Sequence, residues 1–134
     1  MNAQKFREFV MQALFGANAK MSSLEETLLL VQREVACSRE EIQRIEKRTQ
    51  EILDHQTAID SLLQTASTSY AIERIQNVER NILRLGVYEL LYDDDIPPKV
   101  AIAEAIRLSK KFSTPESLTF VNAILDKIHK EHCA

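Results

Sequence analysis

The stretch Ile82–Lys111 reads ILRLGVYELLYDDDIPPKVAIAEAIRLSKK, and this stretch decides the fold. Its first part is a helix with apolar side chains around most of its circumference, which predicts a central position in a helical bundle. Asp93–Asp95 end this helix, because carboxylates are unfavourable at the negative end of a helix dipole. Pro97 and Pro98 then begin an amphipathic second helix, since the fixed φ angle of proline suits the first helical turn.

The composition of the whole chain is typical of an all-α protein. The 134 residues include only two glycines and three prolines, and good helix formers dominate. A chain of this length buries an adequate core without disulfides or metal ions. We expect a single domain, 1–134, of about seven helices, divided at the polar segment Ser67–Ser69 into an N-terminal bundle (1–68) and a C-terminal bundle (69–134).

Local signals predict where the helices of the first half begin and end. The first helix is expected from Ala3 to Phe15, with Gly16 and the two residues after it ending the helix. A second helix is expected to begin at Ser22 or Ser23, where a serine cap precedes acidic residues.

A third helix is predicted to open at Ser38, because Ser38 and Glu41 have the spacing of a capping box. Downstream, the positions from Ile42 to Leu63 recur at the heptad spacing of a coiled coil. This run lasts only about three heptads and includes polar residues. Two consecutive helices with a break near His55 are therefore the preferred interpretation.

The second half contains the central helix and the last helix. Asn77 is predicted to cap the central helix, which ends near Tyr92. Gly86 inside it costs roughly 1 kcal/mol relative to alanine, a cost usually accepted where another backbone approaches closely. The last helix is expected from Pro115 to His132. Its Asn122 is interpreted first as a buried hydrogen-bonding residue and second as a functional group.

Several functional classes are disfavoured by what the sequence lacks. No apolar run approaches the roughly 18 residues of a membrane span and no signal sequence is recognisable, so we expect a cytoplasmic protein without membrane contact. Cys37 and Cys133 form no paired-cysteine motif and are interpreted as reduced thiols. No glycine-rich phosphate loop, activated nucleophile or acid–base pair is recognisable, so we expect no catalytic residues and no enzymatic activity.

Two clusters contain the side-chain types of metal ligands. His129, His132 and Cys133 lie near the C-terminus, but no fourth ligand accompanies them, and a solvated helix end is the preferred interpretation. The carboxylates of Asp93–Asp95 point in different directions on a turn, which disfavours a specific cation site. We therefore expect neither a metal nor a cofactor.

Positive charge gathers at the N-terminus although the net charge is −3. A local patch suffices for RNA binding, because affinity grows with the number of phosphates neutralised. Lys5 and Arg7 are the candidate phosphate contacts, and Phe15 either stacks on a base or lies in the core. Arg80 and Arg84 share a helix face, and internal pairing is the first interpretation and RNA contact the second.

Several segments carry a resemblance to a known family. ILRLGVYELL, DDIPPKVAI, FVN and LDKI resemble the C-terminal half of the NusB family, small all-helical proteins of bacterial transcription antitermination and ribosomal RNA processing. Upstream, AQKFREFVMQALF resembles the first helix of the family, and IDSLL resembles its Ile-Asp element. Ala3 and Gln4 stand where the family has arginines, and Phe15 stands in place of a tyrosine.

The resemblance implies a NusB-like fold, two packed three-helix bundles without a cofactor. It also implies binding of boxA RNA together with NusE, a small-subunit ribosomal protein, as a scaffold in the RNA polymerase antitermination complex. Some members of the family form homodimers, which is a further option. By position, Lys5, Arg7 and Phe15 match the RNA-facing arm and helix, while Glu79 and Glu116 match acidic positions tied to antitermination.

Two alternatives to an RNA-binding antitermination factor follow from the same residues. One is a protein-interaction module that keeps the NusB fold and has lost most RNA affinity, because its basic arm has two fewer arginines. The other is a relative of the NusB-like domain at the front of some RNA cytosine methyltransferases, although no catalytic domain follows Ala134.

Overall fold

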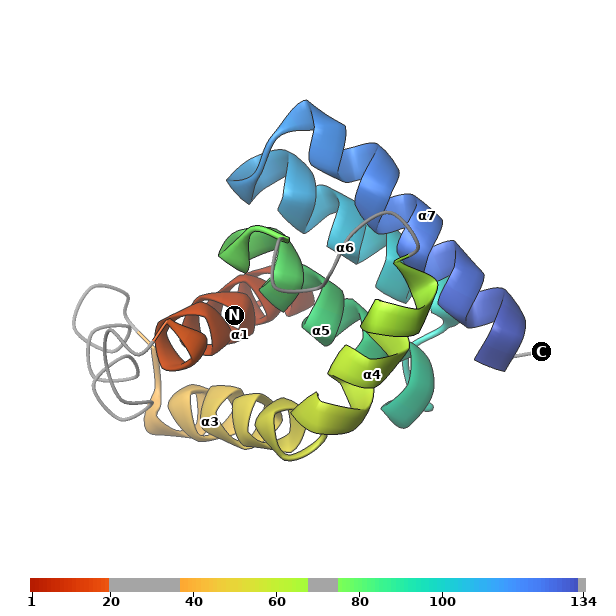
Figure 1. Cartoon of the computed structure of the whole chain (residues 1–134). Helices are drawn as coiled ribbons and strands as arrows, with labels where there is room; N and C mark the ends of the chain where they lie inside the picture. Colours follow the sequence, from red (N-terminus) through yellow and green to blue (C-terminus); the bar gives the residue numbers. More distant parts are fainter. Residues whose placement is uncertain (20–36, 68–74, 133–134) are drawn as a thin grey trace. The chain divides into compact units, whose positions relative to one another are not determined.

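The computed structural model describes residues 1–19, 37–67 and 75–132, and these residues form helices and no strands (Figure 1). The expected all-α class is confirmed. The helices are α1 (Ala3–Asn18), α3 (Arg39–Asp54), α4 (Gln56–Ala66), α5 (Asn77–Tyr92), α6 (Pro98–Phe112) and α7 (Pro115–His132). None of these helices is long and apolar enough to cross a membrane. The helix expected from Ser22 or Ser23 lies outside the described residues.

The chain divides into two compact units, Met1–Asp54 and His55–Ala134. The N-terminal unit contains α1 and α3, and the C-terminal unit contains α4 to α7. This division falls earlier than the polar segment Ser67–Ser69, because α4 packs against α5 and α7. Helix α4 ends at Ala66, and of the polar segment only Ser67 lies within the described residues.

The N-terminal unit begins with α1, which is capped by Asn2. The Asn2 side chain accepts a hydrogen bond from the backbone N–H of Lys5 at 2.8 Å. The helix was expected to run to about Phe15, with the next three residues ending it; α1 instead includes these three residues and ends at Asn18. The Asn18 amide donates to the carbonyl of Leu14 at 2.9 Å and supports the added turn.

The predicted capping box at the start of α3 is confirmed. The backbone N–H of Ser38 donates to Glu41 Oε1 at 2.9 Å, and the Glu41 N–H donates to Ser38 Oγ at 3.1 Å. The Met1 ammonium lies 3.0 Å from the same carboxylate. The backbone hydrogen bond from Ser38, followed by the bond from Met1, lowers the pKa of Glu41 to about 2.

The break predicted near His55 is also confirmed. α3 ends at Asp54 and α4 begins at Gln56, so the heptad pattern belongs to two successive helices in different units. The polar seam residue Thr49 is fully buried, and its hydroxyl donates to the carbonyl of Ile45 at 2.7 Å. A buried hydroxyl satisfied within its own helix is compatible with this packing.

In the C-terminal unit, α5 is the central helix, as its apolar circumference predicts. Every residue from 81 to 89 is buried, and α4, α6 and α7 all pack against α5. Figure 1 shows α6 and α7 running side by side within this unit. The prediction that Asn77 caps α5 is wrong, because Asn77 is the first helical residue and its carbonyl accepts the Asn81 amide at 2.8 Å.

The acidic turn between α5 and α6 ends one helix and begins the next, as predicted. Asp93 follows the last residue of α5, and its side chain accepts the backbone N–H of Asp95 at 3.0 Å. Pro97 precedes α6 with a φ of −61°, and Pro98 is the first helical residue. The local signals of this turn were therefore sufficient to place both helix ends.

Gly86 is needed for the packing of α5, but a side chain approaches it where a backbone was expected. A Cβ atom added at Gly86 would lie 3.0 Å from Leu125 Cδ1 of α7 and 3.5 Å from the Cβ of Ala105 of α6. The missing side chain lets α6 and α7 approach the central helix closely. The cost of glycine in a helix is thus offset by tighter packing.

We expect Gly86→Val to lower the free energy of unfolding by about 1–3 kcal/mol, because its methyl groups overlap Leu125. Urea unfolding followed by circular dichroism measures the change. Ala103→Val, at an exposed position of α6, is the control and should have a smaller effect. Equal loss in both variants would contradict close packing at Gly86.

We expect the stabilisation by Glu41 to disappear in acid. Its pKa of about 2 in the folded chain lies below the ordinary value, so the charged carboxylate stabilises the fold above about pH 4. This contribution is lost as the pH falls towards 2. Glu41→Gln should therefore unfold earlier in urea than the parent at pH 7, with the two converging near pH 2; a gap independent of pH would contradict the assignment.

Candidate functional site

Helix α1 carries three of the candidate RNA contacts, and their exposure differs. The Lys5 side chain is 52% exposed, and its Nζ lies 3.6 Å from the carboxylate of Glu8. Arg7 is only 7% exposed, and Phe15 is half-buried. The surface of α1 therefore offers the ammonium of Lys5 and part of the Phe15 ring, whereas the Arg7 guanidinium is largely shielded from solvent.

A cation on α3, which the sequence reasoning missed, lies against α1. The exposed Arg44 places its Cζ 5.0 Å from the centroid of the Phe6 ring, in the geometry of a cation–π contact. Phe6 directly follows Lys5 in α1. No local signal could have revealed this pair, because the two residues are 38 positions apart and meet only through the packing of α1 on α3.

Arg84 is not at the surface but in the framework of the C-terminal unit. Its side chain is 7% exposed, and its Nε and Nη2 donate to the two carboxylate oxygens of Asp60 at 2.8 and 2.9 Å. A third bond joins Nη1 to the Asn81 side chain at 3.1 Å. This paired arrangement links α4 to α5 and supports the interpretation of internal pairing, with Asp60 as the partner.

Arg80 is held differently from Arg84. It is half-buried, and its Nη2 donates to the side chain of Asn77. Its Nε has no hydrogen-bond partner in the part of the chain that the structure describes. This nitrogen is buried, so the unused donor is withdrawn from solvent at the start of α5.

The two acidic candidates have contrasting environments. Glu79 accepts hydrogen bonds from the hydroxyls of Ser117 and, at 3.4 Å, Ser113. It therefore joins the first turn of α5 to the connection between α6 and α7. Glu116 is exposed in the first turn of α7, where a negative charge is favourable at the helix N-terminus. Glu79 has a positioning role, whereas Glu116 is available at the surface.

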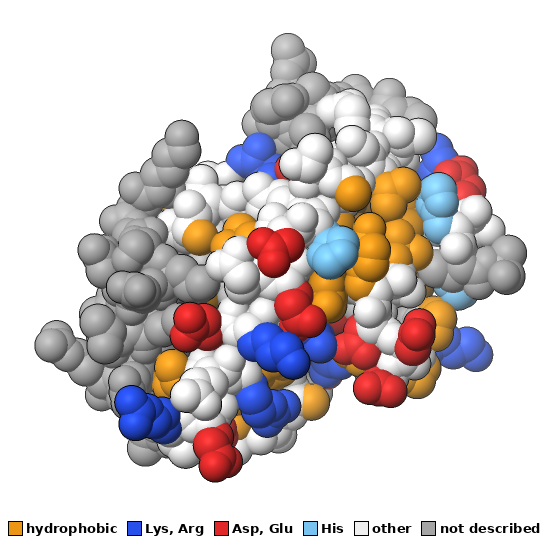
Figure 2. Space-filling view, turned by 90° about the horizontal axis from the view of Figure 1, so that it is seen from below, with side chains coloured by type: hydrophobic (Ala, Val, Ile, Leu, Met, Phe, Trp, Pro, Cys, Tyr) orange, Lys and Arg blue, Asp and Glu red, His pale blue; other side chains and the backbone are white. Residues whose placement is uncertain are grey.

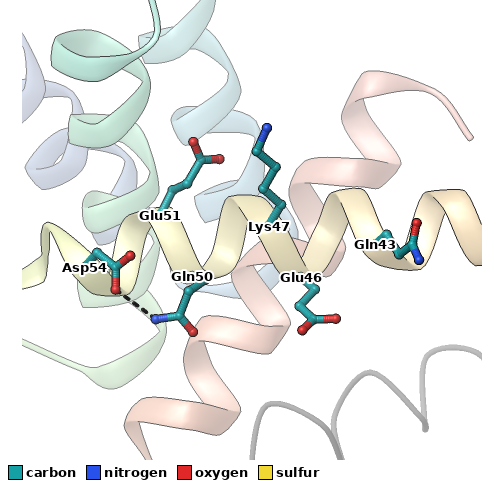
Figure 3. Close-up of a pocket in the computed structure, with 6 residues that line it drawn as sticks. All are labelled: Gln43, Glu46, Lys47, Gln50, Glu51 and Asp54. Atoms are coloured by element: carbon teal, nitrogen blue, oxygen red, sulfur yellow. Dashed lines mark hydrogen bonds between the residues drawn. The ribbon is translucent and has the colours of Figure 1, made fainter.

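An open hollow of about 410 Å³ lies along α3. Its lining is entirely polar and consists of Gln43, Glu46, Lys47, Gln50, Glu51 and Asp54. Figure 3 shows Lys47 and Glu51 on one side of the helix, and a hydrogen bond from Gln50 to Asp54 along it. The carboxylates outnumber the single ammonium, so phosphate groups are disfavoured here, and none of the hydrophobic or aromatic residues that line a typical small-molecule site is present among the lining residues.

The side chains that could have bound a metal ion, and Asn122, are placed as follows in the structure. Within residues 1–19, 37–67 and 75–132, no three His, Cys, Asp or Glu side chains are placed to hold a metal ion. His129 and His132 lie on the last turns of α7, and Cys133 lies outside the described residues. The expectation that Asn122 is buried is wrong, because this face of α7 is exposed to solvent.

On one face of the molecule, charges of both signs are mixed among the described residues. On the face drawn in Figure 2, Lys and Arg side chains lie beside Asp and Glu side chains. A nucleic-acid contact on this face would therefore rely on a few well-placed cations.

Comparison with known sequences shows similarity to one protein family. The model of the NusB family matches residues 4–130 of this chain. The transcription antitermination protein NusB of Trichlorobacter lovleyi is 36% identical over 122 residues, which cover 91% of this chain and 86% of that protein.

Solved structures give the same result for the fold. The NusB structure from T. maritima has a TM-score of 0.88 and 33% identity, over 100% of this chain and 94% of its own. A chain in a crystal structure of the antitermination factors NusB and NusE in complex with dsRNA has a TM-score of 0.83 and 25% identity, over 96% of both chains.

We expect Asp60→Ala to lower the free energy of unfolding by about 2–3 kcal/mol, because it leaves the buried Arg84 without its carboxylate. Chemical denaturation provides the measurement. The control is Glu104→Ala, which removes the partly exposed pair with Arg107 inside α6 and should cost less than about 1 kcal/mol. A loss for Asp60→Ala no larger than that of the control would contradict a structural role for the Arg84–Asp60 pair.

Proposed function

The chain belongs to the NusB family, and from this premise we propose that it is a transcription antitermination and ribosomal RNA biogenesis factor. It binds boxA-type RNA together with the ribosomal protein NusE. The observation that carries the proposal is the likeness in fold and sequence to a chain from the NusB–NusE complex with dsRNA. The cytoplasmic RNA polymerase antitermination complex is the proposed setting.

In this proposal the protein is a scaffold without catalytic activity. Together with NusE it presents a surface that holds the nascent RNA near the polymerase, and phosphate contacts fix the position of the RNA. Cations and aromatic rings are sufficient for that task, and no group has to change its protonation state. The polar hollow on α3 has no part in the proposed function.

The residues proposed to contact RNA directly are those with suitable exposure. Lys5 offers an exposed ammonium for a phosphate, and the half-buried Phe15 offers a ring edge or face for a base. Arg7 adds positive charge beneath this surface, because its guanidinium is largely shielded. Arg80 of the C-terminal unit is half-buried, and we propose it as a secondary contact.

The remaining candidates have supporting roles. We assign Arg84 to the framework, since its donors are occupied by Asp60 and Asn81. Glu79 holds the connection between α6 and α7 in place through Ser113 and Ser117, and so shapes the surface near Glu116. These carboxylates repel phosphate and favour a correctly placed RNA over a loosely bound one.

Titration of labelled boxA RNA tests the function. We expect the chain to bind the RNA more tightly with NusE than without it, and binding to weaken as salt rises from 50 to 200 mM, because counterions are released from the phosphates. A control RNA of equal length and scrambled sequence should bind less tightly. If boxA binding cannot be detected even with NusE, the proposed function is wrong and a protein-interaction module remains.

Lys5→Ala should weaken boxA binding and reduce the slope of log K against log salt by about one, because one phosphate contact is lost. Fluorescence anisotropy at several salt concentrations measures both quantities. Gln12→Ala, which changes an exposed neutral residue of the same helix, is the control and should bind like the parent. An unchanged slope for Lys5→Ala would remove this residue from the RNA surface.

A further inference from the structure

We propose that Arg44 of α3 is a phosphate-binding residue that completes the RNA surface begun by Lys5 of α1. This inference rests on the proposed function and assigns a further residue to it. It concerns the N-terminal unit alone, to which both helices belong.

Two independent contacts place the beginning of α3 beside the beginning of α1. The Met1 ammonium lies 3.0 Å from the Glu41 carboxylate, and the Arg44 guanidinium lies 5.0 Å from the centroid of the Phe6 ring. Lys5 precedes Phe6 and is exposed. The two contacts therefore bring the exposed Arg44 of α3 to the same first turn of α1 that carries the exposed Lys5.

The contact with Phe6 leaves Arg44 ready to bind an anion. A guanidinium stacked on a ring keeps its N–H edge available, and that fork matches two phosphate oxygens. By contrast, Arg84 donates to Asp60, and Arg107 donates to Glu104 at 2.6 Å. Within the described part of the chain, no hydrogen bond or ion pair occupies Arg44, so its position is fixed without use of its donors.

The neighbouring carboxylate does not cancel this charge. Glu41 accepts the Ser38 N–H and the Met1 ammonium, so its negative charge is already compensated. Glu40, one turn before Arg44, is exposed and forms no ion pair with it. The balance of charge among the side chains around Phe6 thus favours an anionic ligand.

Arg44 also supplies a positive charge that the first turn of α1 lacks. Ala3 and Gln4 are both exposed and neutral, so the opening turn of α1 has Lys5 as its single exposed side-chain cation. Arg44 restores a second positive charge at this place from a different helix. Because phosphate affinity depends on where cations lie in space, a cation from α3 substitutes for one from α1.

The test is Arg44→Gln in the full chain, with boxA RNA and NusE, measured by fluorescence anisotropy at several salt concentrations. We expect about tenfold weaker binding and a salt slope lower by about one. The matched control is Lys47→Gln, which removes the same charge one turn away, beside the carboxylates of the hollow. The control should bind within about twofold of the parent.

Phe6→Leu separates positioning from charge. This variant keeps an apolar side chain and Arg44 but removes the ring, so we expect weaker binding with an unchanged salt slope. Thermal unfolding and NusE binding of every variant should match the parent, which establishes that the fold is intact.

The outcomes distinguish this inference from the proposed function. If Arg44→Gln binds RNA like the parent, or if Lys47→Gln loses as much affinity, Arg44 makes no specific contact and the inference is overturned while the proposed function stands. If the parent itself shows no boxA binding with NusE, the proposed function falls and takes the inference with it. A loss specific to Arg44→Gln, with a lower salt slope, supports the assignment.

Discussion

Burial of α5 on every side is the constraint on which the C-terminal unit depends. A helix whose residues 81–89 are all withdrawn from water needs neighbours around its whole circumference, and α4, α6 and α7 provide them. The helices must also come close, which Gly86 allows by leaving room for Leu125. The Pro-Pro start of α6 and the acidic turn before it direct the chain back along this helix.

The same burial explains why several polar residues of α5 have structural roles. Asn81, Arg84 and Glu89 lie within the buried stretch, and a buried charge without a partner is costly. Arg84 meets this requirement through Asp60, which gives the Ile-Asp element of α4 a physical purpose. Helix periodicity places Arg84 beside Arg80 on one face, but it does not show which of the two reaches solvent.

Features that depend on residues close together in the sequence were predicted, whereas features that depend on contacts between distant residues were not. The Ser38–Glu41 capping box, the break at His55 and the helix start at Pro98 depend on residues close in the chain, and all were predicted correctly. The end of α1 was placed about three residues early and the start of α5 one residue late, because the cues at Gly16 and Asn77 were weaker than the helical context. The exposure of Asn122 and the contact of Arg44 with Phe6 depend on tertiary packing, which no local pattern encodes.

Some cations of this chain are paired inside the fold and others are exposed, and this difference bears on how the proposed RNA binding could arise at a net charge of −3. Arg48, Arg84 and Arg107 are each paired with a carboxylate, so their charges are largely compensated within the fold. A cation held by an aromatic ring is different, because stacking fixes its position without neutralising it. The location of a few such cations, more than the total charge, then sets the number of phosphates that the surface neutralises. If Arg44 binds phosphate as proposed, the packing of α1 on α3 compensates for the arginines that the first helix lacks.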